Sequence, residues 1–324
     1  MKILVTGCAG FIGMHVAQKL LQAGHDVVGI DNLNDYYTPQ LKIDRLKQIE
    51  NFENFQFHKM DISNNEAISQ LFDCHNFQRV VHLAAQAGVR YSITNPRAYI
   101  DANITGFFNI IEACRKHKVE HLVYASSSSV YGKNEKLPYS ETDQVDNPVS
   151  LYAATKKSNE LMAFTYSHLY RIPATGLRFF TVYGPWGRPD MSPFIFVKAI
   201  IEGKPIQLFN YGNMSRDFTY IDDIVHGLIE VLNRPPEDQA SAVPHRVLNI
   251  GNHQPVQLTD YVKTIEEVTG VAANIQLAPM QAGDVLSTYA DTELIEKLTQ
   301  FKPNTPLKTG LTEFVNWYRA YHQL

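Results

Sequence analysis

Three closely spaced glycines near the N-terminus constrain the fold more than any other feature of the sequence. Gly7, Gly10 and Gly13 follow the apolar run Ile3–Val5 and precede the amphipathic stretch Phe11–Ala23. This order predicts a strand, a tight turn and a helix. Glycine allows a phosphate to approach the backbone, and a helix N-terminus offers free N–H groups with a partial positive charge. The spacing G-x-x-G-x-x-G therefore predicts a Rossmann-type opening that binds the diphosphate of a dinucleotide.

Two acidic residues after the next predicted strands indicate which dinucleotide is bound. Asp31 ends the apolar run Asp26–Ile30, eighteen residues beyond the last glycine of the motif. A carboxylate at this position can accept hydrogen bonds from the ribose hydroxyls, and it would repel the 2′-phosphate of NADP, so NAD is favoured. Asp61 and Ile62 follow the predicted strand Phe55–His58 and are expected beside the adenine. For both aspartates the alternative is a turn or a helix cap.

Short apolar runs alternate with amphipathic stretches along much of the chain. Further strands are predicted at Val80–Ala84, His121–Ser126, Ala174–Phe179 and Arg246–Ile250, and helices at Ala98–His117, Ser150–Tyr170 and Ile221–Leu232. This alternation predicts an α/β fold with a doubly wound parallel sheet, whose ligands lie at the carboxyl ends of the strands. We expect residues 1–178 and about 219–251 to form the NAD-binding Rossmann domain. Residues from about 179 to 218 and from 252 to 324 would form a smaller, mixed α/β substrate domain.

The composition argues against several classes of partner. The 324 residues carry a formal net charge of −4 and no long basic run, so nucleic acid is not expected. The three cysteines, Cys8, Cys74 and Cys114, are sparse and lack zinc-ligand spacing, as is typical of reduced thiols in a cytosolic protein without a metal site. The apolar N-terminal run is too short for a signal peptide, and no stretch is long enough to span a bilayer. We therefore expect a cytoplasmic protein with no membrane partner.

A tyrosine, a lysine and a serine form the candidate catalytic set. Tyr152 and Lys156 lie four residues apart in a predicted helix, so they share one helix face. The ordinary pKa of tyrosine is about 10, and the Lys156 cation and a positive nicotinamide ring would favour the phenolate that a base requires. Ser127 follows a predicted strand, which places its hydroxyl at the ligand edge of the sheet. Each motif alone also occurs in solvated helices or polar loops, but their order after the glycine motif favours one site.

With these motifs, the chain resembles the extended short-chain dehydrogenase/reductase family, and within it the NAD-dependent nucleotide-sugar epimerases and dehydratases. The resemblance spans nearly the whole length and includes the tracts His82–Ala85, Arg178–Pro185 and Arg216–Asp223. It implies that the tyrosine takes the proton of the sugar 4-hydroxyl while NAD takes the C4 hydride. The lysine then orients the nicotinamide ribose, and the serine hydrogen-bonds the 4-oxygen. The resemblance also implies that NAD stays tightly bound without being consumed, and that a homodimer forms through the helices 98–117 and 150–170.

The resemblance assigns the other site residues by position. The implied cofactor contacts are Gly7, Gly10, Phe11, Ile12, Gly13, Asp31, Asn32, Asp61, Ile62, Leu83, Ala84, Ala85 and Asn103, together with Tyr152 and Lys156. The implied substrate contacts are Arg90, Ser127, Ser128, Ser129, Tyr152, Thr181, Arg188, Arg216 and Asp284. Within this set Arg216 would bind the sugar-nucleotide diphosphate, or alternatively pair with Asp217 at the surface, and Asp284 resembles a ribose-binding acid.

Departures from the family pattern select a reaction. Dehydratases carry Asp-Glu directly after the active-site serine or threonine, where this chain has Ser128 and Ser129, which have no useful acidity near neutral pH. With Tyr152 alone to move protons, oxidation and re-reduction at C4 is the simplest chemistry. If the flat 4-keto intermediate turns over before the hydride returns, the product is the 4-epimer.

Two arginines indicate a uronic acid substrate. The tracts Gln86–Ser92 and Trp186–Met191 are most similar to those of UDP-glucuronate 4-epimerases, which convert UDP-glucuronate to UDP-galacturonate. Arg90 and Arg188, within these tracts, fit a C5 carboxylate, although a solvated loop arginine is the alternative for each. A 4-keto uronic acid is a β-keto acid that can lose CO₂. We therefore expect Thr181, Ser129 and an arginine to hold the carboxylate out of the alignment that this loss requires.

Three other functions compete with this interpretation. The first is a UDP-glucose 4-epimerase, although Gln281 stands where the glucose/galactose epimerases have arginine. The second is a UDP-sugar decarboxylase or dehydratase. The third is a dinucleotide-sensing protein without catalytic activity, against which the intact Ser127, Tyr152 and Lys156 argue.

Overall fold

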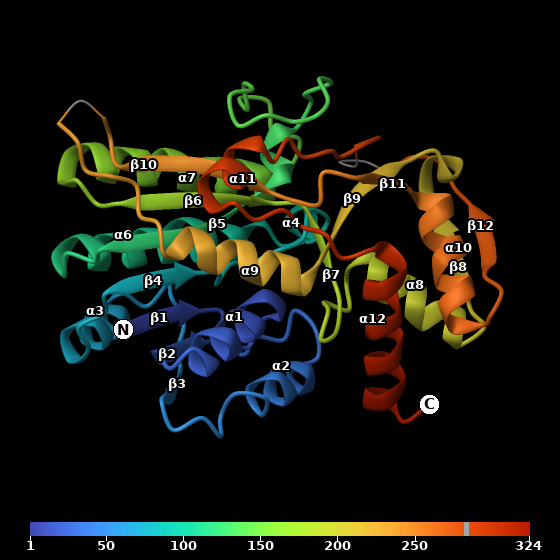
Figure 1. The fold of residues 1–324 in the computed structure, drawn as a ribbon, viewed down its shortest axis with the longest axis horizontal. Coiled ribbons are helices and arrows are strands. Elements are labelled where there is room, and N and C mark those ends of the chain that lie inside the picture. Colours follow the sequence, from blue (N-terminus) through green and yellow to red (C-terminus); the bar gives the residue numbers. More distant parts are fainter. Residues whose placement is uncertain (241, 282–284) are drawn as a thin grey trace.

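A parallel sheet of seven strands forms the centre of the molecule. The computed structural model describes residues 1–240, 242–281 and 285–324. The strands of the sheet are β1 (Lys2–Thr6), β2 (Asp26–Asp31), β3 (Phe55–Lys59), β4 (Arg79–His82), β5 (His121–Ser127), β6 (Ala174–Phe179) and β10 (His245–Ile250). Their order is β10-β6-β5-β4-β1-β2-β3, and every neighbouring pair is parallel (Figure 1). The predicted doubly wound sheet is confirmed, and its strand order reverses beside β1, where such folds bind ligands.

Helices cover both faces of the sheet because successive residues of a buried strand point to opposite sides. In β1, Ile3 and Val5 belong to one hydrophobic core and Leu4 belongs to the other. The first core is closed by α1 (Phe11–Gln22), α2 (Pro39–Leu46), α9 (Ile221–Leu232) and α11 (Glu293–Thr299). The second is closed by α3 (Asn65–Cys74), α6 (Phe107–Lys116) and α7 (Leu151–Tyr170). The helices predicted at 150–170 and 221–232 are thus confirmed as α7 and α9.

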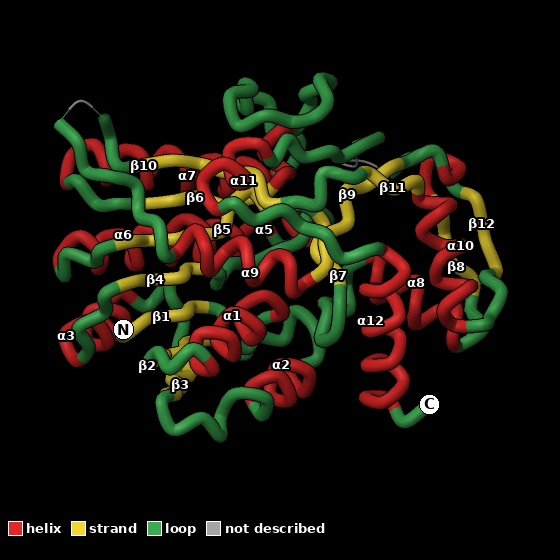
Figure 2. The backbone as a smooth tube through the Cα atoms, in the orientation of Figure 1, coloured by secondary structure: helices red, strands yellow, loops and turns green. Residues whose placement is uncertain are grey.

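A second group of elements lies at one end of the large sheet (Figure 2). It contains β7 (Thr181–Tyr183), β9 (Ser215–Tyr220) and β11 (Pro255–Gln257) in a three-stranded sheet, the parallel pair β8 (Pro205–Leu208) and β12 (Asn274–Leu277), and the helices α8 (Ser192–Ile201), α10 (Leu258–Thr269) and α12 (Leu307–His322). The chain crosses back between the two groups, since β10 pairs with β6 and confirms the strand predicted at 246–250. The boundaries of the two domains stay a prediction.

The helix predicted over Ala98–His117 is wrong in its middle. After α4 (Tyr91–Thr94) and α5 (Pro96–Tyr99), the chain forms a π-helix, η1 (Ile100–Gly106), and only then continues as α6. Asn103 shows the reason, because its carbonyl oxygen accepts a hydrogen bond at 2.6 Å from the side chain of Asn159 on α7. A side chain of the neighbouring helix α7 thus donates a hydrogen bond to a backbone carbonyl within the π-helix. The periodicity of the segment gives no sign of this tertiary contact.

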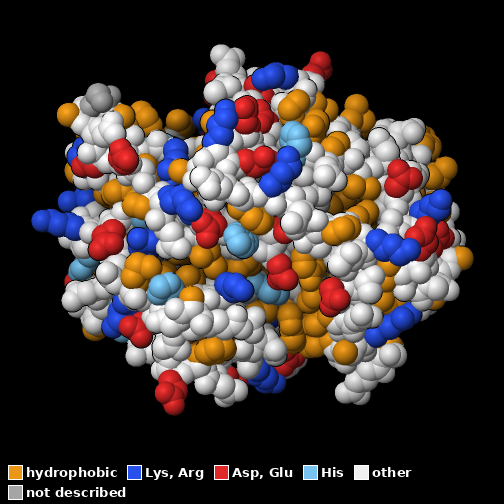
Figure 3. Space-filling view, in the orientation of Figure 1, with side chains coloured by type: hydrophobic (Ala, Val, Ile, Leu, Met, Phe, Trp, Pro, Cys, Tyr) orange, Lys and Arg blue, Asp and Glu red, His pale blue; other side chains and the backbone are white. Residues whose placement is uncertain are grey.

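The surface carries charges of both signs. On the face shown in Figure 3, basic and acidic side chains are interspersed with apolar ones, and that face has no extended basic patch. Within the described ranges, no helix combines the length and the apolar character needed to cross a bilayer. The cysteines Cys8, Cys74 and Cys114 are free thiols.

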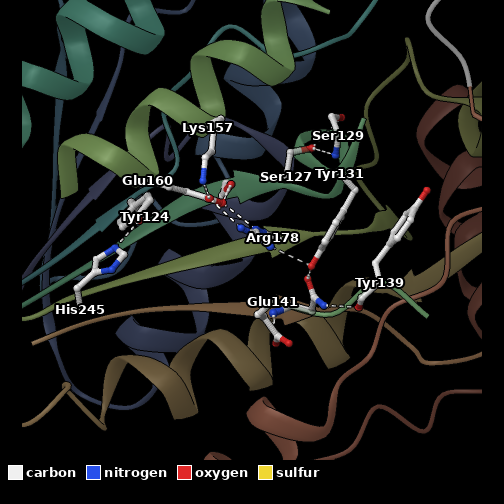
Figure 4. Close-up of polar contacts among 12 residues, drawn as sticks. Tyr124, Ser127, Ser129, Tyr131, Tyr139, Glu141, Lys157, Glu160, Arg178 and His245 are labelled. Atoms are coloured by element: carbon white, nitrogen blue, oxygen red, sulfur yellow. Dashed lines mark hydrogen bonds and ion pairs between the residues drawn. The ribbon is translucent and has the colours of Figure 1, made fainter. Parts of the chain in front are cut away.

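A buried ion pair joins α7 to the sheet. The carboxylate of Glu160 accepts hydrogen bonds from Arg178 Nε at 2.8 Å and Nη2 at 2.9 Å (Figure 4). Ser126 Oγ donates to the same carboxylate at 2.6 Å. Arg178 Nη1 donates to the Tyr131 hydroxyl at 3.1 Å, and that hydroxyl donates to Asn249 Oδ1 at 2.6 Å. The network therefore ties α7, β5, β6, β10 and the 3₁₀-helix η2 (Ser128–Tyr131) together behind the carboxyl ends of the strands.

We predict that Glu160→Gln lowers the free energy of unfolding by about 3–5 kcal/mol, because it leaves the Arg178 charge buried without its counter-charge. The two side chains are only 4% and 3% exposed. Urea denaturation followed by circular dichroism measures the effect. Asp101→Asn is the control, since its pair with Arg97 is largely exposed and should contribute less than about 1 kcal/mol. Equal effects of the two variants would contradict the prediction.

Candidate functional site

A cavity of about 340 Å³ lies at the carboxyl ends of the parallel strands. Of the predicted cofactor residues it is lined by Gly7, Gly10, Phe11, Ile12, Gly13, Asp31, Asn32, Asp61, Ile62, Leu83, Ala84, Ala85, Tyr152 and Lys156. Of the predicted substrate residues it is lined by Ser127, Ser128, Ser129, Thr181 and Arg188. Residues from seven parts of the chain, chosen by motif and resemblance, thus line one cavity because parallel strands end at the same edge of the sheet.

The glycine positions of this turn have no room for a Cβ. A Cβ on Gly13 would lie 2.0 Å from the carbonyl oxygen of Gly7, and a Cβ on Gly7 would lie 2.8 Å from the backbone nitrogen of Ala84. Gly7 also has a φ of +73°, which favours glycine. Gly10 precedes α1, and no side chain caps that helix N-terminus. Its free N–H groups and the bare backbone beside them fit the diphosphate of a dinucleotide.

Asp31 and Asp61 lie along the same cavity. Asp31 accepts hydrogen bonds from the backbone N–H groups of Leu33 at 2.8 Å and Ala9 at 3.2 Å. Burial raises the pKa of its carboxyl, although the Leu33 bond and the Lys42 charge oppose this. Burial also acts to raise the pKa of Asp61, but hydrogen bonds from Asn32, at 2.8 Å, and Ser63 outweigh it and hold that pKa below its ordinary value. Both carboxylates are therefore held in fixed orientations.

The three candidate catalytic side chains converge on the cavity from β5 and α7. Burial raises the pKa of Tyr152, and its hydrogen bond with Ser127 and the charge of Arg188 oppose this rise. The expectation that Lys156 and a positive nicotinamide ring favour the Tyr152 phenolate stays a prediction. Lys156 Nζ donates to the carbonyl oxygen of Ala125 at 2.9 Å, and burial lowers the lysine's own pKa to about 8. The sequence places both residues on one face, but it cannot show what each head group contacts.

A serine cluster forms the part of the wall next to Tyr152. Ser127 Oγ donates to Ser129 Oγ at 3.0 Å and accepts from the backbone N–H of Ser129 at 3.2 Å (Figure 4). This second bond caps η2 and turns the chain at the end of β5. Ser128 and Thr181 line the cavity beside the cluster. Hydroxyl groups, which can donate and accept hydrogen bonds, therefore surround the end of β5.

Arg188 is the only arginine among the described residues that line this cavity. Its Nε donates to Asp190 Oδ1 at 3.0 Å and its Nη2 to Asp190 Oδ2 at 2.5 Å. Tyr36 donates to the same Asp190 Oδ2 at 2.9 Å. Sequence reasoning missed Tyr36 and Asp190. The tract Asn34–Tyr37 carried no recognised motif, and Asp190 is marked only by its place two residues after Arg188.

Three of the predicted site residues that the structure describes do not line the cavity. Arg90 is exposed, with its guanidinium 5.4 Å from the centre of the Phe209 ring. Arg216 donates to the carbonyl oxygen of Ser215 at 2.9 Å. Asn103 is buried behind the wall, where its side chain bonds both backbone groups of Gln86, at 2.8 Å to the nitrogen and 3.0 Å to the oxygen. Its effect on a cofactor is therefore indirect. Asp284 lies outside the described residues.

The described part of the chain contains no group of histidine, cysteine, aspartate and glutamate side chains arranged to bind a metal ion. The described residues that line the cavity offer the Tyr152 phenol, the Lys156 amine, serine and threonine hydroxyls, the Arg188 guanidinium and the carboxylates of Asp31 and Asp61.

Comparisons with known proteins agree with this geometry. The family described as "NAD dependent epimerase/dehydratase family" matches residues 3–251. Protein CapI of Staphylococcus aureus is 52% identical over 334 aligned residues, with 100% of both chains covered. UDP-glucuronate 4-epimerase 4 of Arabidopsis thaliana is 47% identical, with 99% of this chain and 76% of that protein covered. The solved structure of UDP-glucuronic acid 4-epimerase from Bacillus cereus, in complex with UDP-glucuronic acid and NAD, matches with a TM-score of 0.90 and 35% identity, covering 99% of this chain and 100% of that one.

We predict that Gly13→Ala abolishes retention of NAD, since its Cβ would collide with the Gly7 carbonyl and displace the turn. NAD released from the denatured, purified protein measures the content per chain. Gly24→Ala, at the other end of α1, is the control. Its Cβ would meet nothing within 4 Å, and its φ of +80° should cost only about 1 kcal/mol of stability. A Gly13→Ala protein with wild-type NAD content would contradict the assignment of this turn.

Proposed function

Because the chain belongs to the NAD dependent epimerase/dehydratase family, we propose that it is an NAD-dependent isomerase that converts UDP-glucuronate to UDP-galacturonate by epimerisation at C4. The observation that carries the proposal is the shared cavity, in which a dinucleotide cradle, the Ser127 and Tyr152 hydroxyls and the Arg188 guanidinium lie together. The Arabidopsis and Bacillus cereus relatives, named as UDP-glucuronate and UDP-glucuronic acid 4-epimerases, support it.

The cofactor residues of this chain fit NAD. Gly7, Gly10 and Gly13 leave room for the diphosphate, and Asp31 offers a carboxylate to the ribose hydroxyls. Bound NAD would accept the C4 hydride of the sugar and return it to the opposite face of the 4-keto intermediate. Since the cofactor is restored in each cycle, a cradle that retains it tightly suits this reaction.

Tyr152 is the proposed base. Its phenolate would take the proton of the sugar 4-hydroxyl and give it back after the sugar has turned. Ser127, which interacts with the phenol, would hydrogen-bond the 4-oxygen and keep the proton path short. Because burial raises the pKa of the phenol, the protein alone keeps Tyr152 protonated at neutral pH. The positive nicotinamide ring and Lys156 would favour the phenolate when cofactor is bound.

The charged groups of the cavity argue against elimination chemistry. Among the described residues that line it, the carboxylates are Asp31 and Asp61, and both belong to the cofactor end. The wall beside Tyr152 offers Ser128 and Ser129 instead of an acid and a base. Among the described residues, a sugar oxidised at C4 therefore meets no carboxylate beside Tyr152 that could drive elimination, and this favours return of the hydride.

Arg188 is the proposed partner of the C5 carboxylate, together with Thr181 and Ser129, which line the same cavity. These three groups would hold the carboxylate away from alignment with the C4 carbonyl and so prevent loss of CO₂. Arg90 does not share this wall, so Arg188 is the arginine that the geometry favours. The roles of Arg216 at the sugar-nucleotide diphosphate and of Asp284 at the ribose stay predictions.

We also propose that the protein is a homodimer in the cytoplasm. The helices α6 and α7 pack side by side and expose Phe108, Leu161 and Phe164, which are 44%, 57% and 48% exposed. These apolar side chains support a homodimer through the two helices. Three free thiols support a cytoplasmic location. Neither nucleic acid nor a membrane is part of the proposed function.

We expect Tyr152→Phe to lower kcat about 10²- to 10⁴-fold, because it removes the proton-transfer group and leaves the shape of the cavity. NAD content and UDP-glucuronate binding, measured by calorimetry, should stay close to wild type. In the wild type, kcat/KM should rise with pH as the phenolate forms.

Tyr170→Phe, exposed at the end of the same helix, should retain full activity. An active Tyr152→Phe enzyme would exclude this base, and a wild type that binds both ligands without turnover would favour the sensor.

We expect Arg188→Ala to lower kcat/KM for UDP-glucuronate about 10- to 100-fold, the size of a lost charged hydrogen bond, and to raise the share of pentose product. NMR of the products separates the 4-epimer from pentose, and the same assay with UDP-glucose tests the rival epimerase. Arg97→Ala, an exposed arginine on α5, is the control. Unchanged kinetics of Arg188→Ala on UDP-glucuronate would rule out the carboxylate assignment.

A further inference from the structure

The guanidinium of Arg188 is held along one edge. Asp190 accepts from its Nε and Nη2 at 3.0 and 2.5 Å, and the two side chains are 22% and 25% exposed. A guanidinium has five N–H donors in one plane, and this pairing uses two of them. The hydrogens of Nη1 and the second hydrogen of Nη2 form the other edge, which has the right shape for a second carboxylate. Asp190 therefore determines which edge of Arg188 remains for a ligand.

Tyr36 holds Asp190 from a distant part of the chain. Its hydroxyl donates to Asp190 Oδ2 at 2.9 Å, and its ring packs on Tyr91 with centroids 4.7 Å apart. Gly88 leaves room for this contact, since a Cβ there would lie 2.5 Å from the Tyr36 hydroxyl oxygen and 3.7 Å from Asp190 Oδ2. Gly88 also has a φ of +97°, and Tyr99 donates to its carbonyl oxygen. The segments that contain Tyr36, Gly88 and Asp190 thus pack closely around the Asp190 carboxylate.

The backbone that carries Arg188 is fixed by a second, fully buried arginine. Arg45 donates to the carbonyl oxygen of Trp186 from Nε at 3.0 Å and Nη2 at 2.6 Å, and to that of Gly187 at 3.1 Å. Its Nη1 donates to the carbonyl oxygen of Ala9, within the glycine motif, at 3.2 Å. Arg45 and Tyr36 both follow Asp31 in the chain. The segment after the ribose-binding position therefore fixes the loop of Arg188, and it does so relative to the cofactor cradle.

We propose that Asp190 and Tyr36 are positioning residues that aim the free edge of Arg188 at the C5 carboxylate and thereby set the ratio of epimer to pentose. This inference rests on the proposed function and adds the groups that give Arg188 its direction. Asp190 also neutralises Arg188, so that the pair offers a directed set of donors instead of a net positive charge. The direction of the Arg188 donors matters because the 4-keto intermediate loses CO₂ when its carboxylate bond rotates into alignment with the C4 carbonyl.

The competing loss of CO₂ needs no further reagent. In the 4-keto uronic acid, the bond between C5 and the carboxylate carbon breaks, and its electron pair forms a C4–C5 double bond. The carbonyl π pair moves to the C4 oxygen, CO₂ leaves, and C5 then takes up a proton to give a 4-keto pentose. This requires the breaking bond to lie parallel to the carbonyl π system. A carboxylate held by a fixed guanidinium edge is kept out of that geometry.

Asp190→Asn tests the proposal with little change of shape. The amide nitrogen cannot accept from Arg188, so one of the two hydrogen bonds and the counter-charge are lost. Because Arg188 keeps its charge, KM for UDP-glucuronate should not rise. The value of kcat should fall about tenfold and the pentose-to-epimer ratio should rise about tenfold, the size of one charged hydrogen bond. Tyr36→Phe should change both quantities in the same direction by a smaller factor of about threefold, because Asp190 keeps both of its hydrogen bonds from Arg188.

Asp35→Asn is the matched control, because it removes an exposed carboxylate beside Tyr36 that does not line the cavity, and it should behave as wild type. NAD content of each variant reports whether the cradle is intact. A product ratio at the wild-type value in both Asp190→Asn and Tyr36→Phe overturns the proposal. A raised KM for UDP-glucuronate with an unchanged pentose-to-epimer ratio also overturns it, because that result would indicate that these residues only stabilise the fold. A wild-type enzyme that does not epimerise UDP-glucuronate overturns the proposed function, and the inference with it, before any variant is compared.

Discussion

The close packing of Gly7 and Gly13 at the turn between β1 and α1, where a Cβ would not fit, is the constraint on which the rest of the site depends. The carbonyl of Gly7 fills the space in which a Cβ of Gly13 would lie, and Gly7 in turn touches the backbone of Ala84 after β4. This packing brings the uncapped N-terminus of α1 to the edge where the parallel strands end. Every group that acts on the sugar is then placed relative to that edge, because β5 and β6 end there too.

Burial decides the charge state of the groups around this edge. The pKa of Tyr152 is raised and that of Lys156 is lowered to about 8, so the protein alone disfavours the charged form of each. Arg188 keeps its charge beside Asp190, which accepts two hydrogen bonds from it. An enzyme that cycles a proton between a phenol and a sugar benefits from this arrangement. In the proposed reaction, the charge that activates the phenol would arrive with the cofactor, and the fixed ion pair would orient the substrate.

Sequence reasoning was most successful where a motif coincides with the end of a strand. Ser127, Tyr152 and Arg188 lie far apart in the chain but share the cavity, as the topology of a doubly wound sheet requires. It was less successful where a role depends on contacts between distant segments. Asn103 bonds the backbone of Gln86 instead of lining the cavity, and it lies in the π-helix η1, where its carbonyl accepts a hydrogen bond from Asn159. The apolar spacing of Leu311, Phe314 and Tyr318 could have predicted α12, which the motif search passed over.

The sequence by itself determined the fold class, the glycine turn of the cofactor cradle and the candidate catalytic side chains that share the cavity. These follow from local rules, since glycine spacing, apolar periodicity and the i, i+4 relation act within a few residues. Only the tertiary structure decided how those groups are aimed and charged. It placed Lys156 against the carbonyl of Ala125, excluded Arg90 from the cavity wall and joined Tyr36, Asp190 and Arg188 across more than 150 residues of chain. Such contacts depend on where whole elements pack, and no local pattern in the chain records that.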